Sequence, residues 1–218
     1  MEAHKAFQQD ADSTLTGCAS FAPQYDQLKV RDIITSYDRL KASIAERHIP
    51  TAEHSIRVRI YATSLGFECR LSGSELTTLS IAAEIHDIGK LQVPTGILEK
   101  EECLTGEEWS IIRMHPVWGA KIAALSFPTM PEIAQCIRLH HEHLDGSGYP
   151  DELSGYEIPM LARILCVADV FAALTEERAF RHAFTDIEAL RILMHEEAER
   201  YDEYIVEMLA RSRLSRSI

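Results

Sequence analysis

Apolar residues recur along most of this chain at spacings of three and four, the period of an amphipathic helix. The first such stretch begins at Leu28 and is expected to break at Pro50. Its apolar stripe consists of Val30, Ile33, Ile34, Tyr37, Leu40 and Ile44. Residues 1–27 lack this period and mix Gln, Asp, Ser, Thr and Gly. We therefore expect a flexible lead-in over 1–27 and a folded catalytic domain over 28–218.

Short local patterns mark where the other helices begin and end. Three stretches have the pattern of a capping box: Ser72–Glu75, Thr105–Glu108 and Thr185–Glu188. Thr51 is expected to cap the second helix and Gly66 to end it, while Pro116 is expected to end or kink a later one. Residues 91–104 are predicted to be a connection. No stretch alternates as a strand would, so the predicted fold class is all-α.

The size and composition of the chain limit its class. It has 218 residues, of which 46% are hydrophobic, which is enough for one domain with a real core. No apolar run approaches the roughly 18 residues of a membrane span, and the first residues lack the pattern of a secretory signal. The five cysteines include no CxxC pair, which favours free thiols in a reducing compartment. We therefore expect a cytoplasmic protein that makes no membrane contact.

The net charge of −12 argues against a large nucleic-acid partner, because proteins that bind DNA or RNA broadly are usually basic. A small anionic substrate is still compatible with this charge. Bound divalent metals can turn a local acidic and histidine-rich pocket positive, and the local charge decides what binds there.

The candidate chemistry lies in seven His and Asp residues on segments that are predicted to be helical: His54, His86, Asp87, His115, His140, His141 and Asp169. One such residue alone is most simply a buried polar group, and a His-Asp pair at a helix end is most simply a cap. Here four separate helices present His or Asp on a buried face. Buried charges have to be paired or metal-bound, so this many independent residues indicate a metal site.

Imidazole and carboxylate ligands suit iron, manganese, zinc or nickel, and the residue types alone do not choose among them. Seven ligands are too many for one tetrahedral zinc and suit two metals. Two metals that share a bridging carboxylate typically lie about 3.5–4 Å apart and hold a water molecule as hydroxide between them. Such a centre is suited to in-line attack on a phosphate ester.

Four sequence motifs, taken together, resemble the HD-GYP domain, a bacterial branch of the HD phosphohydrolase superfamily. They are HDIGK at 86–90, RMHPVWGAKI around His115, HHE running into DGSGYP at 140–150, and ARILCVADVFAALTEERAFR at 162–181. The resemblance covers about residues 28–212. It implies a helical HD-domain bundle with a buried dinuclear metal site, and hydrolysis of the second messenger cyclic di-GMP to linear pGpG or on to GMP.

The resemblance also assigns the ligands. His54, His86, Asp87 and Asp169 would hold one metal, and Asp87 would bridge to a second. The other ligands of the second metal would be His115, His140 and His141. From the family, the two divalent ions are expected to be iron or manganese.

Further roles follow from the resemblance alone. Lys90 would contact the scissile phosphate or the bridging hydroxide, so Lys90 and Asp87 are the expected catalytic residues. Tyr149, Arg178 and Arg181 would grip the second phosphate of the dinucleotide, since guanidinium groups match phosphate oxygens. Without the resemblance, Arg178 and Arg181 would be read as a solvated helix end.

The sequence departs from the family in three places. Pro50 stands where some members have a glutamate that holds a third metal, so two metals are expected. Ala172 stands where many members have a second aspartate, which removes a carboxylate one turn from Asp169. Losses of this kind commonly cost about 10–100-fold in metal affinity or activity. Finally, no sensor domain is expected ahead of the catalytic part, so a homodimer, a regulatory partner protein or the metal state would control it.

The leading hypothesis is a metal-dependent cyclic di-GMP phosphodiesterase. One alternative is a weakly active or inactive module that binds a cyclic dinucleotide and signals through a partner protein. Ala172 motivates this alternative, whereas the complete set of seven ligands and Lys90 argues against it. Another alternative is a phosphodiesterase for a different cyclic dinucleotide, which a panel of substrates would separate from the first.

Overall fold

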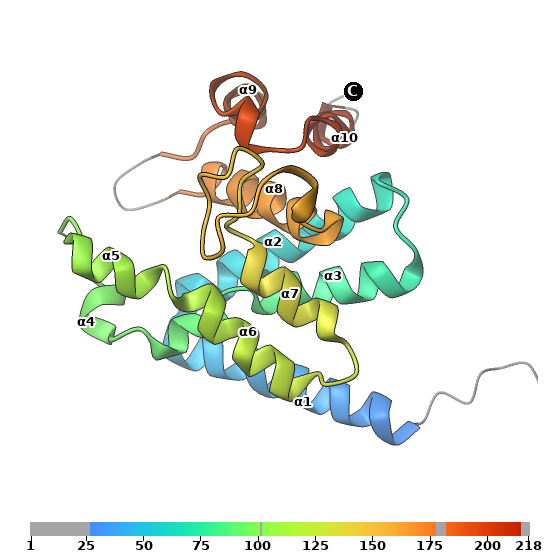
Figure 1. Ribbon diagram of the computed structural model, residues 1–218, viewed down its shortest axis with the longest axis vertical. Helices are drawn as coiled ribbons and strands as arrows, with labels where there is room; N and C mark the ends of the chain where they lie inside the picture. Colours follow the sequence, from blue (N-terminus) through green and yellow to red (C-terminus); the bar gives the residue numbers. More distant parts are fainter. Residues whose placement is uncertain (1–26, 101, 178–181, 215–218) are drawn as a thin grey trace, which may run out of the picture.

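A computed structural model describes residues 27–100, 102–177 and 182–214, and these residues form helices and loops without a strand (Figure 1). The α-helices are α1 (Gln27–Arg47), α2 (Ile49–Glu68), α3 (Gly73–Ile85), α4 (Thr95–Leu98), α5 (Gly106–Ile112), α6 (His115–Ser126), α7 (Pro131–Leu139), α8 (Met160–Leu174), α9 (Asp186–Arg191) and α10 (Glu203–Leu214). Short 3-10 or π turns are η1 (Ile88–Gln92), η2 (Gly155–Glu157), η3 (Ile192–Glu196) and η4 (Ala198–Arg200). The all-α prediction is confirmed. The expected lead-in lies outside the described residues, apart from Gln27 at the start of α1, and the division at residue 27 stays a prediction.

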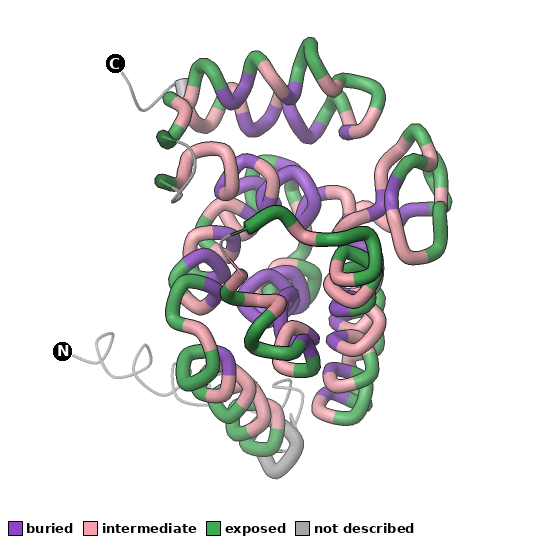
Figure 2. The backbone as a smooth tube through the Cα atoms, turned by 90° about the vertical axis from the view of Figure 1, so that its left-hand side faces the viewer, coloured by how far each residue is buried: buried purple, intermediate pink, exposed green. Residues whose placement is uncertain are grey.

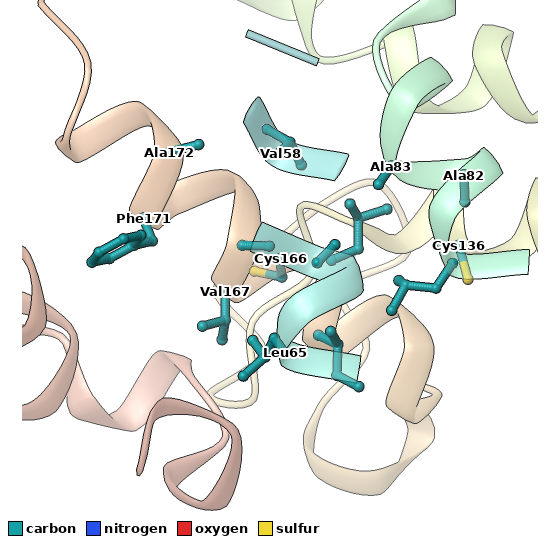
Figure 3. Packing of buried hydrophobic residues seen from close by; sticks show 14 of the residues in the cluster. Val58, Leu65, Ala82, Ala83, Cys136, Cys166, Val167, Phe171 and Ala172 are labelled. Carbon is teal, nitrogen blue, oxygen red and sulfur yellow. The ribbon is translucent and has the colours of Figure 1, made fainter. Parts of the chain in front are cut away.

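Helix α2 runs through the middle of the bundle and packs against α1, α3, α8 and α10. Its apolar positions Val58 and Leu65 are completely or almost completely buried, and they share one continuous core with Phe171 and Ala172 of α8 (Figure 3). Buried positions lie on the inner sides of the helices, and exposed positions on the outer sides (Figure 2). Ala172, the departure noted in the sequence, is therefore part of the hydrophobic core.

The local patterns predicted most helix starts correctly. All three predicted capping boxes form, with each Ser or Thr side chain accepting from the Glu backbone and each Glu side chain accepting from the cap backbone. The connection predicted over 91–104 also holds the single-turn helix α4 and the end of η1. The predicted break near Pro116 is real, but α5 ends at Ile112 and α6 begins at His115.

The boundaries of α2 differ from the prediction at both ends. His48 caps this helix in place of Thr51, because the His48 Nδ1 accepts a hydrogen bond from the Thr51 backbone N–H at 3.2 Å. Pro50 lies in the first turn, where its missing N–H costs nothing, so the chain bends before the proline. Gly66 does not end α2, which continues to Glu68; a Cβ at Gly66 would lie 3.0 Å from side-chain atoms of Leu71 and Leu79.

Within the described part of the chain, no helix combines the length and the apolar character that crossing a membrane requires. Cys69, Cys103, Cys136 and Cys166 are free thiols, and Cys103 alone among these four is exposed.

Candidate metal centre

All seven predicted ligands meet at one place inside the bundle. They come from five elements rather than the expected four helices: His54 from α2, His86 and Asp87 from the end of α3, His115 from the start of α6, His140 and His141 from the end of α7, and Asp169 from α8. Three overlapping groups have ligand atoms within 4.8 Å of one another: His54 with His86 and Asp87, His86 with His140 and Asp169, and His115 with His140 and His141. Six of the seven residues are buried and His141 is half-buried.

Asp87 lies between two sets of histidines. Its Oδ2 is 3.4 Å from the Nε2 of His86, and its Oδ1 is 3.2 Å from the Nε2 of His115. The side chain of Asp87 is only 3% exposed, so both oxygens face protein rather than solvent. The two oxygens of Asp87 therefore face histidines of two different groups.

The group on one side of Asp87 is formed by His54, His86 and Asp169. The Asp169 Oδ1 lies 2.8 Å from the His54 Nε2 and 3.7 Å from the His86 Nε2. On the other side of Asp87, the Nε2 atoms of His115 and His140 are 3.3 Å apart. The imidazole of His141 stands close by, with its ring centroid 4.0 Å from that of His140.

Three of the histidines are oriented by the backbone carbonyl three residues earlier in the chain. The Nδ1 atoms of His86, His115 and His140 lie 2.8, 2.8 and 2.7 Å from the carbonyl oxygens of Ala83, Ile112 and Ile137. Since a carbonyl can only accept, the Nδ1 of each ring carries a proton, and in the neutral form of the ring its Nε2 is bare. In that form the Nε2 atoms face one another and the carboxylates of Asp87 and Asp169 with no hydrogen between them. Such a cluster of lone pairs fits a divalent cation, which imidazole and carboxylate bind well.

The local sequence explains why these carbonyls are available. The last carbonyls of a helix have no intrahelical donor, and His86 and His140 directly follow the last residues of α3 and α7. The carbonyl of Ile112 would normally accept from residue 116, but Pro116 has no N–H. Each of these histidines thus follows a helix end that leaves a free acceptor three residues back.

The charges inside the cluster also favour binding of a cation. Burial opposes protonation of His86, but Asp87 and Asp169 outweigh it and raise the pKa of His86 to about 9, so the two carboxylates favour a positive charge at this position. Burial lowers the pKa of His140 well below its usual value and, with His115, that of His141 to about 3, which leaves both rings neutral and able to ligate. Burial also opposes ionisation of Asp87, but Lys90 and His86 hold the pKa of Asp87 well below its usual range.

Gly89 allows the two sides of the centre to approach each other. A Cβ at this position would lie 1.9 Å from the His115 carbonyl oxygen and 2.6 Å from the Gly119 backbone nitrogen. Gly89 does not end the helix before it, because α3 already ends at Ile85. Its actual role is close packing of η1 against the start of α6.

Lys90 lies beside the centre, where its Nζ donates to the Asp87 Oδ2 at 2.7 Å. The Lys90 side chain is 27% exposed, whereas Asp87 is buried, so the ammonium group stands between the carboxylate and solvent. A cation in this position can meet an incoming anion.

The 145–150 loop places Tyr149 against the centre. The Tyr149 ring stacks on the His141 ring with centroids 4.8 Å apart, and the Arg113 guanidinium lies 4.5 Å from the Tyr149 centroid. Burial, followed by the charges of Asp87 and Asp169, raises the pKa of Tyr149, so its hydroxyl keeps its proton. The Tyr149 backbone N–H also donates to the His141 carbonyl at 3.1 Å.

Several supporting residues were not found in the sequence. Glu142 follows the His140-His141 pair, is 2% exposed, and accepts from the backbone N–H groups of Asp151 and Leu153 at 2.7 and 3.1 Å. Glu142 is part of the HHE motif at 140–142, so its place in the motif could have indicated a role. Arg113 begins the motif around His115, and Glu176 lies in the motif at 162–181, but neither was assigned a role. Arg178 and Arg181 lie outside the described residues.

The sequence pattern of the HD domain family matches residues 31–205, most of the chain. This chain belongs to the HD domain family. The match confirms the superfamily named from the motifs, whose phosphohydrolases are metal-dependent, and it agrees with the clustered His and Asp residues.

The relatives of this HD domain are longer proteins. Over 176 residues it is 36% identical to the cyclic di-GMP phosphodiesterase response regulator RpfG of Xanthomonas campestris, covering 80% of this chain and 47% of that protein. Over 171 residues it is 34% identical to 3′3′-cGAMP-specific phosphodiesterase 2 of Vibrio cholerae, covering 78% of this chain and 33% of that protein. The chain thus spans about a third to a half of the length of these curated relatives.

The fold of the HD domain is also similar to solved structures. A cyclic GMP-AMP specific phosphodiesterase of V. cholerae superposes with a TM-score of 0.60 at 20% identity, covering 79% of this chain and 48% of that one. An HDG"Y"P protein of Bdellovibrio bacteriovorus gives a TM-score of 0.60 at 19% identity, covering 73% and 51%. At these identities the likeness shows the fold alone, and it confirms the predicted helical HD bundle.

Proposed function

We propose that this HD domain is a metal-dependent phosphodiesterase that hydrolyses cyclic di-GMP to pGpG, and pGpG on to GMP. The observation that carries the proposal is the meeting of bare imidazole nitrogens and two carboxylates from five elements beside Tyr149 and Lys90. Relatives named as cyclic dinucleotide phosphodiesterases support the substrate class.

Two divalent ions, iron or manganese, would occupy the centre. His54, His86, Asp87 and Asp169 would hold the first. Asp87 would bridge to the second, which His115, His140 and His141 would complete. The two oxygens of Asp87 support this division, since each faces histidines of a different group.

Bound divalent metals supply Lewis acidity to a phosphate and activate a water for attack on phosphorus. The residues of the chain would do the rest. Asp87 orients the centre and holds Lys90, whose ammonium group would stabilise the negative charge that develops on the phosphate oxygens.

Substrate contacts would come from the open side of the centre. Tyr149 would contact the dinucleotide beside the metals, and Arg178 and Arg181 would grip its second phosphate. Arg113 joins these proposed contacts because its guanidinium lies over the Tyr149 ring, within reach of a molecule that contacts the tyrosine.

A second candidate substrate is 3′3′-cGAMP. Two relatives named as specific for this dinucleotide are 34% identical to the chain, close to the identity shared with RpfG, so overall identity does not separate the two substrates. A weakly active module that binds a cyclic dinucleotide and signals through a partner protein is the third reading. The proposal includes a cytoplasmic location, which the four free thiols among the described residues support, and regulation by a homodimer or a partner protein.

The test is turnover of cyclic di-GMP, 3′3′-cGAMP and cyclic di-AMP by protein purified without oxygen and loaded with ferrous iron or manganese. Products are separated by chromatography, and a double variant with His86→Ala and Asp87→Ala serves as the control. Linear dinucleotide or mononucleotide produced by the unmutated protein alone is the expected result. The substrate turned over with the highest kcat/KM assigns the specificity. No product from any of the three, despite two bound metals, would overturn the enzyme proposal in favour of the binding module.

A further inference from the structure

His54 is held differently from the other histidines of the centre. It lies inside α2, where the carbonyls of the preceding turn accept from helical N–H groups and are not free for a side chain. Its Nδ1 instead lies 2.9 Å from the Oε2 of Glu176, a residue 122 positions away in the sequence. Its Nε2 lies 2.8 Å from the Oδ1 of Asp169. Both ring nitrogens therefore face carboxylates.

A neutral imidazole has one N–H, so the two carboxylates compete for it. If the proton is on Nδ1, it is donated to Glu176 and the Nε2 is bare and available to a metal. If the proton is on Nε2, it is donated to Asp169 and that nitrogen cannot ligate. The carboxylate of Glu176 favours the first arrangement, which is the one that backbone carbonyls impose on His86, His115 and His140.

Glu176 is itself held in place. The Arg57 guanidinium is paired with the Glu176 Oε1 and stands three residues after His54 on α2. The side chain of Glu176 is 16% exposed, so its carboxylate is largely shielded from water. Arg57 thus compensates the charge of Glu176 and leaves its other oxygen, Oε2, for His54.

We propose that Glu176 is a positioning residue for the first metal site, because it fixes the proton of His54 on Nδ1 and so leaves the Nε2 of His54 free to bind metal. The inference rests on the proposed metal centre. Ala172 is part of the hydrophobic core and has no carboxylate, whereas Glu176, four residues further along the chain, supplies one to His54.

The inference is tested by titrating manganese into the metal-stripped protein. Calorimetry measures the affinity of each binding step, and electron paramagnetic resonance shows whether the bound ions are magnetically coupled. The unmutated protein is expected to take up two ions that are magnetically coupled. In Glu176→Ala one of the two binding steps should weaken by about 10–100-fold while the other is unchanged. At intermediate manganese the variant should then show the spectrum of an isolated ion. Glu176→Gln keeps an acceptor oxygen without the charge and should weaken the same step less.

Glu53→Ala is the matched control, because it removes an exposed carboxylate next to His54 on the same helix and should leave both steps unchanged. Circular dichroism and thermal unfolding in the presence of chelator show whether each variant folds. If Glu176→Ala does not fold, the metal affinities of the isosteric variant Glu176→Gln test the inference instead. Equal weakening of both steps would indicate a merely structural role and overturn the inference, as would no change in either. If the unmutated protein binds a single ion, the proposed two-metal centre is overturned. In that case, weaker binding of the single ion in Glu176→Ala would still support the role of Glu176, and unchanged binding would reject this role.

Discussion

The two sides of the centre are built in different ways. On the side of His115 and His140, the histidines stand beside helix ends, and backbone carbonyls choose which nitrogen is bare. On the side of His54, a carbonyl orients His86 in the same way, but His54 lies within a helix, and there the side chain of Glu176 makes the choice. A carbonyl cannot be removed by a substitution, whereas a glutamate can. The first side should therefore be sensitive to backbone packing and the second to single side chains.

The largest effect is expected from Gly89→Ala. The new Cβ would meet the His115 carbonyl oxygen at 1.9 Å and the Gly119 nitrogen at 2.6 Å, so η1 and α6 have to separate. We expect the free energy of unfolding, measured by denaturant titration, to fall by about 2–4 kcal/mol, together with loss of metal binding. Gly96→Ala is the control, because nothing lies within 4 Å of its Cβ position. Equal stability of the two variants would refute the close packing at Gly89.

Asp87→Asn is expected to weaken metal binding on both sides of the centre. It removes the charge from a carboxylate whose two oxygens face histidines of different groups. Metal analysis after dialysis should show both ions weakened, in contrast to Glu176→Ala, which should affect one. Retention of one ion at wild-type affinity would show that Asp87 serves a single site and does not bridge.

An intermediate effect is expected from Glu142→Gln. The buried carboxylate accepts from the backbone N–H groups of Asp151 and Leu153, and the amide of Gln cannot accept equally well at both oxygen positions. Thermal and denaturant unfolding should show a loss of about 1–3 kcal/mol. Metal content should be unchanged, because Glu142 braces the loop that follows the ligands and not the ligands themselves. Exposed Glu132→Gln on α7 is a suitable control.

The smallest effect is expected from Arg113→Met. Loss of the guanidinium over the Tyr149 ring removes a cation–π contact of roughly 0.5–2 kcal/mol. Steady-state kinetics on the preferred dinucleotide should show a higher KM with both metals still bound. A lower metal content with unchanged KM would instead place Arg113 with the proposed ligands.

Much of this architecture follows from local sequence. Capping boxes and the helical period predicted the fold class, and the seven His and Asp residues were identified because charged groups on buried stripes need a partner. The roles of other residues could not be predicted from the sequence. Gly89 lies in the HDIGK motif, but the sequence did not show that it packs against a carbonyl 26 residues later. Glu176 lies in the motif at 162–181, but nothing near it in the sequence indicates its partner His54, which is 122 residues away. Such long-range contacts have no periodic signature in one sequence.

His54 also connects two packed helices through a rigid ring. One nitrogen lies against Asp169 within α8 and the other against Glu176 just beyond its end, while the histidine itself belongs to α2. The rigid imidazole therefore spans two helices whose spacing is set by core residues such as Val58 and Phe171. A volume change at these apolar positions would displace His54 relative to the two carboxylates. Core residues that touch none of the seven His and Asp side chains thereby influence the distances within the cluster.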